Sequence, residues 1–286
     1  MDISSNQVLF AFLLAALAGF STAIGAIIAF FSRQDNLKVL SIGLGFSAGV
    51  MIYISFMEIL PQAFKDFSQV YEGFLGEFIA IVCFFLGIAL SAFVDKLIPE
   101  NLHLDEKGQY DELKICPLVE HKTNANIKLH NSKQKALKRT GILTAIAIAI
   151  HNFPEGFATF VSSLDSLSFG IAIAIAVAIH NIPEGMAVSL PIYHATGDKK
   201  KAFIYSALSG LTEPIGALVG VFLLLPFVGD LTLAFTFAII AGIMVYISFD
   251  ELLPAARVYG EAHHCLYGLL VGMGIMALSL ALLNNA

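Results

Sequence analysis

Two copies of one six-residue motif carry most of the side chains that could bind a metal ion. Residues 151–156 read HNFPEG, and residues 180–185 read HNIPEG. Residues four apart share one face of a helix, so the histidine and the glutamate of each copy point in the same direction. Imidazole nitrogen and carboxylate or amide oxygen together suit divalent first-row ions such as zinc, iron, manganese and cobalt. The pair of motifs therefore predicts a divalent-cation site.

A third acidic residue, Glu213, lies in another apolar segment and is followed by Pro214. The side chains that we expect at the site are His151, Asn152, Glu155, His180, Asn181, Glu184 and Glu213. A charge at the bilayer centre costs at least about 2.5–3.5 kcal/mol, and no Lys or Arg lies at the same depth to offset it. Cations shared among the three carboxylates explain the accompanying neutral ligands. The two motif glutamates can each bridge, so that two ions could be held close together.

The composition determines the surroundings of this site. Of the 286 residues, 57% are hydrophobic and only 13% are charged, which excludes a monomeric soluble globule. The apolar residues form runs of about twenty, the length that crosses a bilayer as a helix. We therefore predict an all-α membrane protein with eight transmembrane helices. The predicted spans are Val8–Phe31, Leu37–Leu60, Gly73–Ile98, Thr140–Leu164, Leu167–Tyr193, Ala202–Pro226, Leu231–Ala256 and His264–Leu283.

The positions of the basic residues predict the orientation of these spans. If both termini are outside, fifteen of the sixteen Lys and Arg residues fall in inside segments, and only Lys65 lies outside. Such a bias is the main orientation signal of membrane proteins. We therefore expect a multi-pass protein of the cell (plasma) membrane with both termini outside. The long polar segment 99–139 is expected to be a cytoplasmic loop.

Two further segments repeat each other. Residues 47–63 and 240–256 are identical at eleven of seventeen positions, and they lie in predicted spans of opposite direction. Similar spans of opposite direction indicate an inverted repeat, the common plan of secondary transporters. The helices are thus expected in a 3+2+3 arrangement. Its parts are a first three-helix repeat (1–98), the loop (99–139), the central motif helices (140–193) and an inverted three-helix repeat (194–286).

The repeated segments also carry acidic residues away from the predicted centre. Glu58 and Glu251 occupy equivalent positions, and Asp250 precedes the second of them. Glu58 is interpreted as part of an outer entrance, and Asp250 and Glu251 as part of an inner exit. Solvated acids at helix ends are an equally good interpretation.

At these motifs the sequence resembles the ZIP (Zrt/Irt-like protein) family of divalent-metal transporters, and most closely its bacterial ZupT-type branch. The resemblance extends over essentially the whole chain, including the residues 47–63 and the Glu-Pro pair at Glu213. It implies import of zinc, and of iron, manganese, cobalt and cadmium, into the cytoplasm by alternating access through a binuclear site. One implied position uses His151, Glu155, His180 and Glu184, with Met51 as a weak addition; the other uses Asn152, Glu155, Asn181, Glu184 and Glu213.

Two other functions remain open from the side chains alone. The first is an intramembrane metal-dependent hydrolase, in which the ion would activate water. The second is an efflux carrier that uses the same ligands. The expectation is that the chain is not an enzyme, needs no cofactor, and has divalent ions as its transported substrate. The expected partners are these ions and the lipid bilayer, with no nucleic acid; a homodimer is left open.

Overall fold

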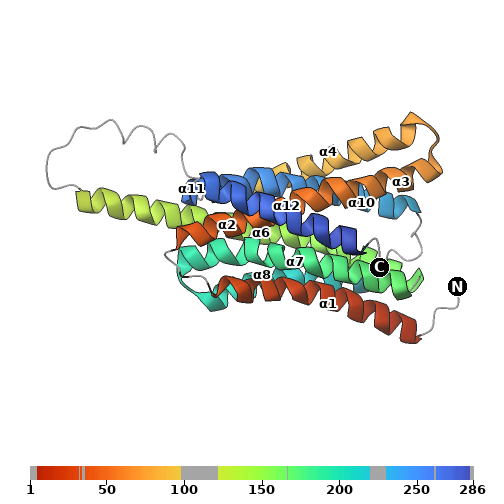
Figure 1. Ribbon diagram of the computed structural model, residues 1–286, viewed down its shortest axis with the longest axis horizontal. Coiled ribbons are helices and arrows are strands. Elements are labelled where there is room, and N and C mark those ends of the chain that lie inside the picture. Colours follow the sequence, from red (N-terminus) through yellow and green to blue (C-terminus); the bar gives the residue numbers. More distant parts are fainter. Residues whose placement is uncertain are drawn as a thin grey trace.

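A computed structural model describes residues 5–31, 33, 36–97, 122–165, 167–219, 230–260 and 262–283, and this part of the chain is helical apart from short turns (Figure 1). Eleven of its elements are α-helices and two are π-helices. In chain order they are α1 (Ser5–Ala29), α2 (Leu37–Ile54), η1 (Ser55–Ile59), α3 (Leu60–Val70), α4 (Phe74–Leu97), α6 (Lys122–Asp165), α7 (Leu167–Thr196), α8 (Lys199–Gly210), α9 (Thr212–Val219), α10 (Asp230–Tyr246), η6 (Ile247–Leu252), α11 (Leu253–Tyr259) and α12 (Ala262–Leu283).

Side-chain caps and glycines define several helix ends. Asn36 caps α2 by accepting a hydrogen bond from the backbone nitrogen of Val39, 3.2 Å away. Asp198 caps α8 in the same way through the backbone nitrogen of Lys201, 3.0 Å away, and this bond lowers the pKa of the Asp198 carboxyl group. Gly73 and Gly197 have positive φ angles in the turns between α3 and α4 and between α7 and α8.

The two repeated segments form the same local structure. In each of them a long helix passes through one π-helical turn, η1 or η6, directly before a helix with proline in its first turn, Pro61 or Pro254. Proline has no N–H to give to the preceding turn, so the hydrogen-bond register shifts there without ending the rod. Each π-helical turn contains the acidic residue that the two segments share, Glu58 in η1 and Glu251 in η6.

Seven helices of the described chain are long and apolar enough to cross a membrane. They are Asn6–Ala29, Leu37–Val70, Phe74–Lys96, Ile173–Thr196, Lys199–Val219, Leu231–Val258 and Ala262–Leu282. The fourth predicted span, Thr140–Leu164, lies within α6 but is not among them, because the polar side chains of its motif lower its mean hydropathy. The prediction of a membrane protein built from helices is thus confirmed, and the eighth span stays a prediction.

The polar segment 99–139 differs from the expected loop in its second part. Helix α6 begins at Lys122 and continues into the predicted fourth span, so residues 122–139 are helical. Residues 98–121 lie outside the described residues.

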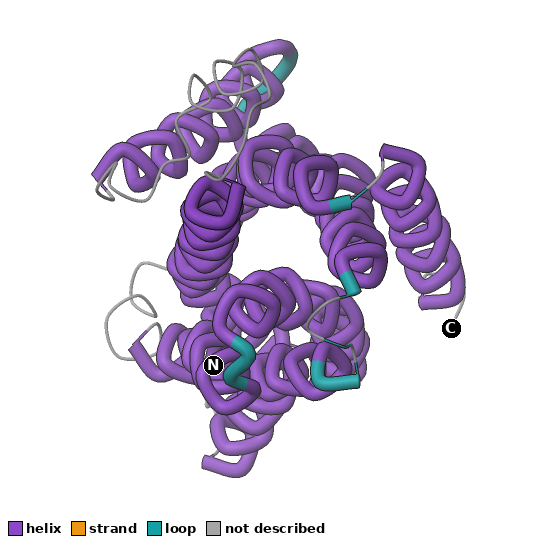
Figure 2. Tube along the Cα trace, turned by 90° about the vertical axis from the view of Figure 1, so that its left-hand side faces the viewer, coloured by secondary structure: helices purple, strands orange, loops and turns teal. Residues whose placement is uncertain are grey.

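The helices pack as two bundles (Figure 2). Helices α1, α6, α7, α8 and α9 pack mainly on one another and form what we call the site bundle. Helices α2, α3, α4, α10, α11 and α12 form the flanking bundle. The two bundles meet chiefly where α2 lies against α7 and α10 lies against α6. Helices that are neighbours in space are therefore not always neighbours along the chain. Helix α1 packs mainly against the motif helices α6 and α7, and not against α2–α4.

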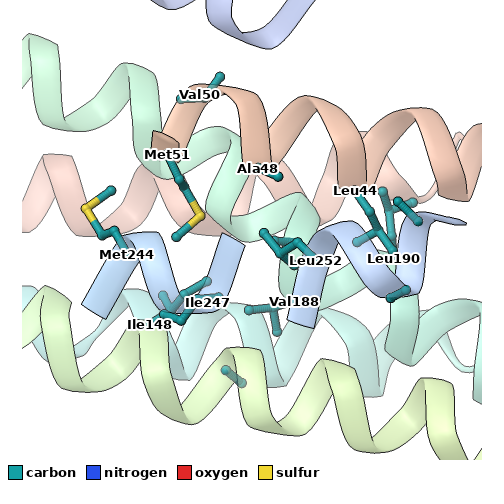
Figure 3. Packing of buried hydrophobic residues seen from close by; sticks show 14 of the residues in the cluster. Leu44, Ala48, Val50, Met51, Ile148, Val188, Leu190, Met244, Ile247 and Leu252 are labelled. Carbon is teal, nitrogen blue, oxygen red and sulfur yellow. The ribbon is translucent and has the colours of Figure 1, made fainter. Parts of the chain in front are cut away.

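An apolar cluster fills much of the contact between the bundles (Figure 3). Its buried members include Leu44, Ala48, Val50 and Met51 from α2, Ile148 from α6, Val188 and Leu190 from α7, and Met244, Ile247 and Leu252 from α10 and η6. On the outside, large apolar side chains such as Leu17, Phe20 and Phe85 are exposed, as expected of a surface that faces lipid.

Candidate metal site

The two motif helices exchange histidine–glutamate pairs. Nε2 of His151 on α6 lies 3.1 Å from Oε1 of Glu184 on α7. Nε2 of His180 on α7 lies 2.7 Å from Oε1 of Glu155 on α6. Each histidine thus pairs with the glutamate of the other motif rather than with its own. All four side chains are buried, with at most 7% of any of these residues exposed.

Helical spacing and antiparallel packing explain this reciprocal pattern. Each motif lies inside an unbroken helix, with Pro154 in α6 and Pro183 in α7. Since α6 and α7 are consecutive in the chain and pack closely, they run in opposite directions. An approximate two-fold axis between them then places each histidine opposite the glutamate of its partner helix.

The two asparagines connect this centre to the neighbouring helices of the site bundle. Nδ2 of Asn181 donates to the backbone oxygen of Ala18 on α1, 2.9 Å away, and also to Oε1 of Glu213. Nδ2 of Asn152 donates to the backbone oxygen of Ser209 on α8, 3.3 Å away. The structure therefore brings Glu213 beside the second motif.

Glu213 owes its position to a break between α8 and α9. The rod is interrupted after Gly210, and Glu213 lies in the first turn of α9, directly before Pro214. Proline cannot donate a hydrogen bond to the turn before it, which favours a break at this point. The carboxylate consequently lies at a helix N-terminus, where the helix dipole favours a negative charge.

Every one of the seven predicted ligands keeps a buried polar atom without a hydrogen-bond partner in the described residues. These atoms are Nδ1 of His151 and His180, Oδ1 of Asn152 and Asn181, and Oε2 of Glu155, Glu184 and Glu213. Buried polar atoms are nearly always paired, and a cluster of unpaired ones needs an explanation. All seven are atom types that coordinate divalent metal ions.

In this conformation several of the predicted ligands form hydrogen bonds with one another. Among the described residues, no three His, Cys, Asp or Glu side chains converge in an arrangement that would hold an ion between them. Instead, each histidine–glutamate pair engages one ligand nitrogen and one ligand oxygen in a hydrogen bond.

A cavity of about 280 Å³ reaches the site from the end of the molecule where α3 meets α4. Glu155 and His180 lie at its inner part, and Glu58, Gln62 and Asp66 lie towards its outer part. Glu58 thus lines a cavity that also reaches Glu155, and its role at an entrance stays a prediction. Gln62 and Asp66 were not predicted, although they follow Glu58 at helical spacing.

The repeat-related residues at the other end of the molecule line a much smaller cavity. Glu251 lines a cavity of only about 20 Å³, together with Asp95 and Ala147. Arg139 on α6 lies 2.8 Å from Asp95 on α4 and 4.0 Å from Glu251 on η6, so it connects the site bundle to the flanking bundle. Asp250 is exposed. The role of Arg139 was missed because its charge had been used only to predict orientation.

Met51 lies in the apolar cluster between the bundles. It is fully buried there, as is Met244, its counterpart in the repeat. Packing in this apolar cluster is sufficient to explain why Met51 is buried. Its position therefore gives no support to its assignment as a metal ligand.

Comparison with known proteins gives consistent matches over the whole chain. A family model described as "ZIP Zinc transporter" matches residues 4–95 and 101–280. The chain is 67% identical to a zinc transporter ZupT of Campylobacter jejuni, with the full length of both chains covered. It is 52% identical to a zinc transporter ZupT of Clostridium perfringens, covering 97% of both chains. A zinc transporter ZupT of Streptococcus mutans is 51% identical and covers 97% of this chain and 99% of its own.

Proposed function

Because the chain belongs to the ZIP family of zinc transporters, we propose that it imports zinc into the cytoplasm through the site between α6 and α7. The resemblance that its motifs indicated is therefore confirmed at the level of the family. The protein is a multi-pass membrane protein, and its transporter relatives agree with the expectation that it is not an enzyme. Zinc is then a transported substrate and not a resident cofactor.

One observation carries this proposal: seven buried ligand side chains each keep an unpaired polar atom. When an ion enters, the histidine–glutamate hydrogen bonds would be exchanged for bonds to the metal. We propose one ion position at His151, Glu155, His180 and Glu184, with Met51 as its weakest member. We propose a second at Asn152, Glu155, Asn181, Glu184 and Glu213, with the two motif glutamates bridging both.

The division into two bundles supports alternating access by movement of the site bundle against the flanking bundle. In this scheme the ion enters past Glu58, through the cavity that reaches Glu155. It leaves past Glu251 and Asp250 after the small cavity at the other end has widened. The ion gradient and the membrane potential would drive the transport.

The remaining predictions belong to the same proposal. They are the eighth span at Thr140–Leu164, both termini outside the plasma membrane, transport of iron, manganese, cobalt and cadmium besides zinc, and a homodimer as the assembly to be tested. The inward direction rests on the family, since the same ligands would also serve an efflux carrier.

The first experiment measures zinc uptake in a host that lacks its own zinc importers. Glu155→Ala removes a carboxylate shared by both ion positions, and we expect uptake to fall at least about a hundredfold, because even residues outside the ligand shell change metal affinity by 10–100-fold. Glu77→Ala is the matched control, since Glu77 is an exposed glutamate in the first turn of α4. Uptake by Glu155→Ala equal to that of the parent would contradict the assigned role.

Three measurements then refine the proposal. A fall in cellular zinc when the protein is expressed would indicate efflux instead of import. Counting the zinc or cadmium ions bound per purified chain tests the binuclear site: two ions are expected, and one ion in the wild type would contradict it. Competition of iron, manganese, cobalt and cadmium with zinc uptake tests the range of substrates.

A further inference from the structure

The contacts around the site follow one consistent symmetry. Asn152 and Asn181 are equivalent residues of the two motifs, and their amides donate to the backbone oxygens of Ser209 and Ala18. The symmetry that exchanges α6 with α7 therefore also exchanges α8 with α1. It aligns Ala18 of α1 with Ser209 of α8.

Close contacts of glycines confirm this alignment. Gly19 and Gly210 follow Ala18 and Ser209, and a methyl group added to either would collide with the backbone oxygen of the other. The glycines that end the motifs behave in the same way: a methyl group at Gly156 would collide with the backbone oxygen of Glu213, and one at Gly185 with that of Thr22.

Thr22 of α1 therefore occupies the position that Glu213 occupies in α9. The same difference in residue number relates Ala18 to Ser209, Gly19 to Gly210 and Thr22 to Glu213. The side chains agree with it, because the Cβ atom of Thr22 lies against Gly210 as that of Glu213 lies against Gly19. One half of the site thus has an asparagine with a glutamate, and the other half has an asparagine with a threonine.

The hydroxyl group of Thr22 lacks the partner that a helical threonine usually has. The residue is fully buried, and its Oγ1 atom has no hydrogen-bond partner in the described residues. A threonine in a helix normally donates to the backbone oxygen four residues earlier. Here that oxygen, on Ala18, already accepts from Asn181 and from Oγ of Ser21. Oδ1 of Asn152 is unpaired as well.

We propose that Thr22 is a further residue of the cation site, where its hydroxyl group holds a water ligand of the ion that Oδ1 of Asn152 coordinates. This inference rests on the proposed function, since it concerns the same site. The site then consists of an acidic half, with Asn181 and Glu213, and a neutral half, with Asn152 and Thr22. A neutral half lets the ion keep part of its hydration shell and limits the negative charge that holds it.

The first test compares zinc affinity of purified full-length variants. Thr22→Val removes the hydroxyl group at nearly constant shape, and we expect zinc to bind about three- to tenfold more weakly, the effect of one lost hydrogen bond. Thr22→Ser keeps the hydroxyl group and should bind zinc like the wild type. Thr144→Val is the matched control, because Thr144 is a fully buried threonine of α6 whose hydroxyl group is also unpaired in the described residues.

The second test exchanges the two halves. Glu213→Thr alone should lower zinc uptake about a hundredfold, as expected for a lost ligand. In the double variant Thr22→Glu with Glu213→Thr, the carboxylate moves to the symmetry-equivalent position. We expect uptake by this variant to recover at least tenfold over Glu213→Thr alone. Recovery would require Thr22 to face the same ion and would not follow from a purely structural role.

Each outcome has one meaning for the inference. If wild-type protein binds and imports zinc while Thr22→Val binds zinc with unchanged affinity, Thr22 is not part of the site, although the proposed function stands. If Thr22→Val and Thr144→Val weaken binding equally, the effect is structural and the inference is also overturned. If the wild type neither binds nor imports zinc, the proposed function and this inference fail together.

Discussion

Two cavities of the molecule are built from repeat-related residues and yet differ greatly in size. The cavity of about 280 Å³ is lined by Ile54 and Glu58 of the first repeated segment and by Ala176, one turn before His180. The cavity of about 20 Å³ is lined by the equivalent residues Ile247, Glu251 and Ala147. Nearly the same sequence therefore lines a large cavity at one end of the molecule and a small one at the other.

The two ends also differ in the residues that connect the bundles. At the end with the smaller cavity, Arg139 of the site bundle pairs with Asp95 and approaches Glu251 of the flanking bundle. The residue equivalent to Arg139 in the second motif helix is Ser168, which has no charge to form such a pair. Two equivalent ends in unequal states are what a two-state transporter with inverted repeats requires, because exchanging the states of the ends opens the site to the other side.

The largest expected effect is a difference in access to the two cavities. Ala176→Cys and Ala147→Cys place matched cysteines, each one turn before a motif histidine, in a background without the native cysteines. We expect a small water-soluble thiol reagent to label Ala176→Cys about a hundredfold faster, because a minor state of a two-state protein is commonly populated at about 0.1–10%. The labelling rates of the purified protein are the measurement.

Saturating zinc serves as the control for this labelling, since bound metal should protect Ala176→Cys next to His180. Equal labelling of the two positions would remove the basis of the comparison. It would mean that the two ends are equally open in solution.

Replacing Arg139 should narrow the difference between the ends. Arg139→Gln leaves Asp95 and Glu251 without their cation, and Arg139 is only 8% exposed. Removing one partner of a fully buried pair costs 3–5 kcal/mol; because the side chain of Asp95 is 21% exposed, we expect about 2 kcal/mol for this pair, which corresponds to roughly thirtyfold. Labelling of Ala147→Cys should therefore accelerate by this factor.

Lys200→Gln removes an exposed positive charge from α8 and is the control for net charge. If Arg139→Gln leaves the labelling of Ala147→Cys unchanged, the ion pairs do not hold this end closed, and the apolar cluster alone must do so.

Much of the site could be predicted from the sequence, and little of this difference between the ends could. Helical spacing and the antiparallel order of two adjacent spans were sufficient to bring His151, Glu155, His180 and Glu184 together, because both rules are local. The ion pair of Arg139 with Asp95 joins helices that are distant in the sequence, and orientation rules count charges without assigning them partners. Thr22 was missed although residues 11–28 and 202–219 are identical at eight of eighteen positions, because Thr22 itself differs from its equivalent Glu213 and carries no charge.

The fold shows the same division between local and distant information. Seven of the predicted spans correspond to apolar helices, since length and hydropathy are properties of single segments. The π-helical turns were not predicted, because a proline reveals a disturbed helix but not how the hydrogen bonds shift around it. The grouping of α1 with the motif helices also could not be read from a 3+2+3 order, because order along the chain does not determine neighbours in space.

A smaller effect is expected from a hydrogen bond that exists in only one of the two repeats. Oγ of Ser47 on α2 donates to the backbone oxygen of Pro183 on α7, 2.6 Å away, and so connects the two bundles. The equivalent of Ser47 is Ile240, which cannot donate. Ser47→Ala removes about 1 kcal/mol from the observed state, so the labelling of Ala147→Cys should rise about fivefold.

Ser41→Ala is the matched control for this prediction. Oγ of Ser41 donates to the backbone oxygen of Ala256 over 2.7 Å, and both residues belong to the flanking bundle. Its loss should lower the overall stability without changing the ratio of the labelling rates. An equal change of that ratio in both variants would show that the bond of Ser47 does not favour one state.

The smallest expected effect concerns Glu58, which is exposed beside the larger cavity. Glu58→Gln removes a negative charge that attracts cations to the passage, and an exposed charge contributes about 0.2–1 kcal/mol, so the KM for zinc should rise about two- to threefold. The kcat should not change, because Glu58 does not hold the ion in the site. Since exposed charges are screened by salt, the difference from the wild type should shrink as ionic strength rises, whereas Glu77→Gln should show no difference. A fall in kcat with an unchanged KM would contradict the entrance role and would instead make Glu58 part of the movement between the two states.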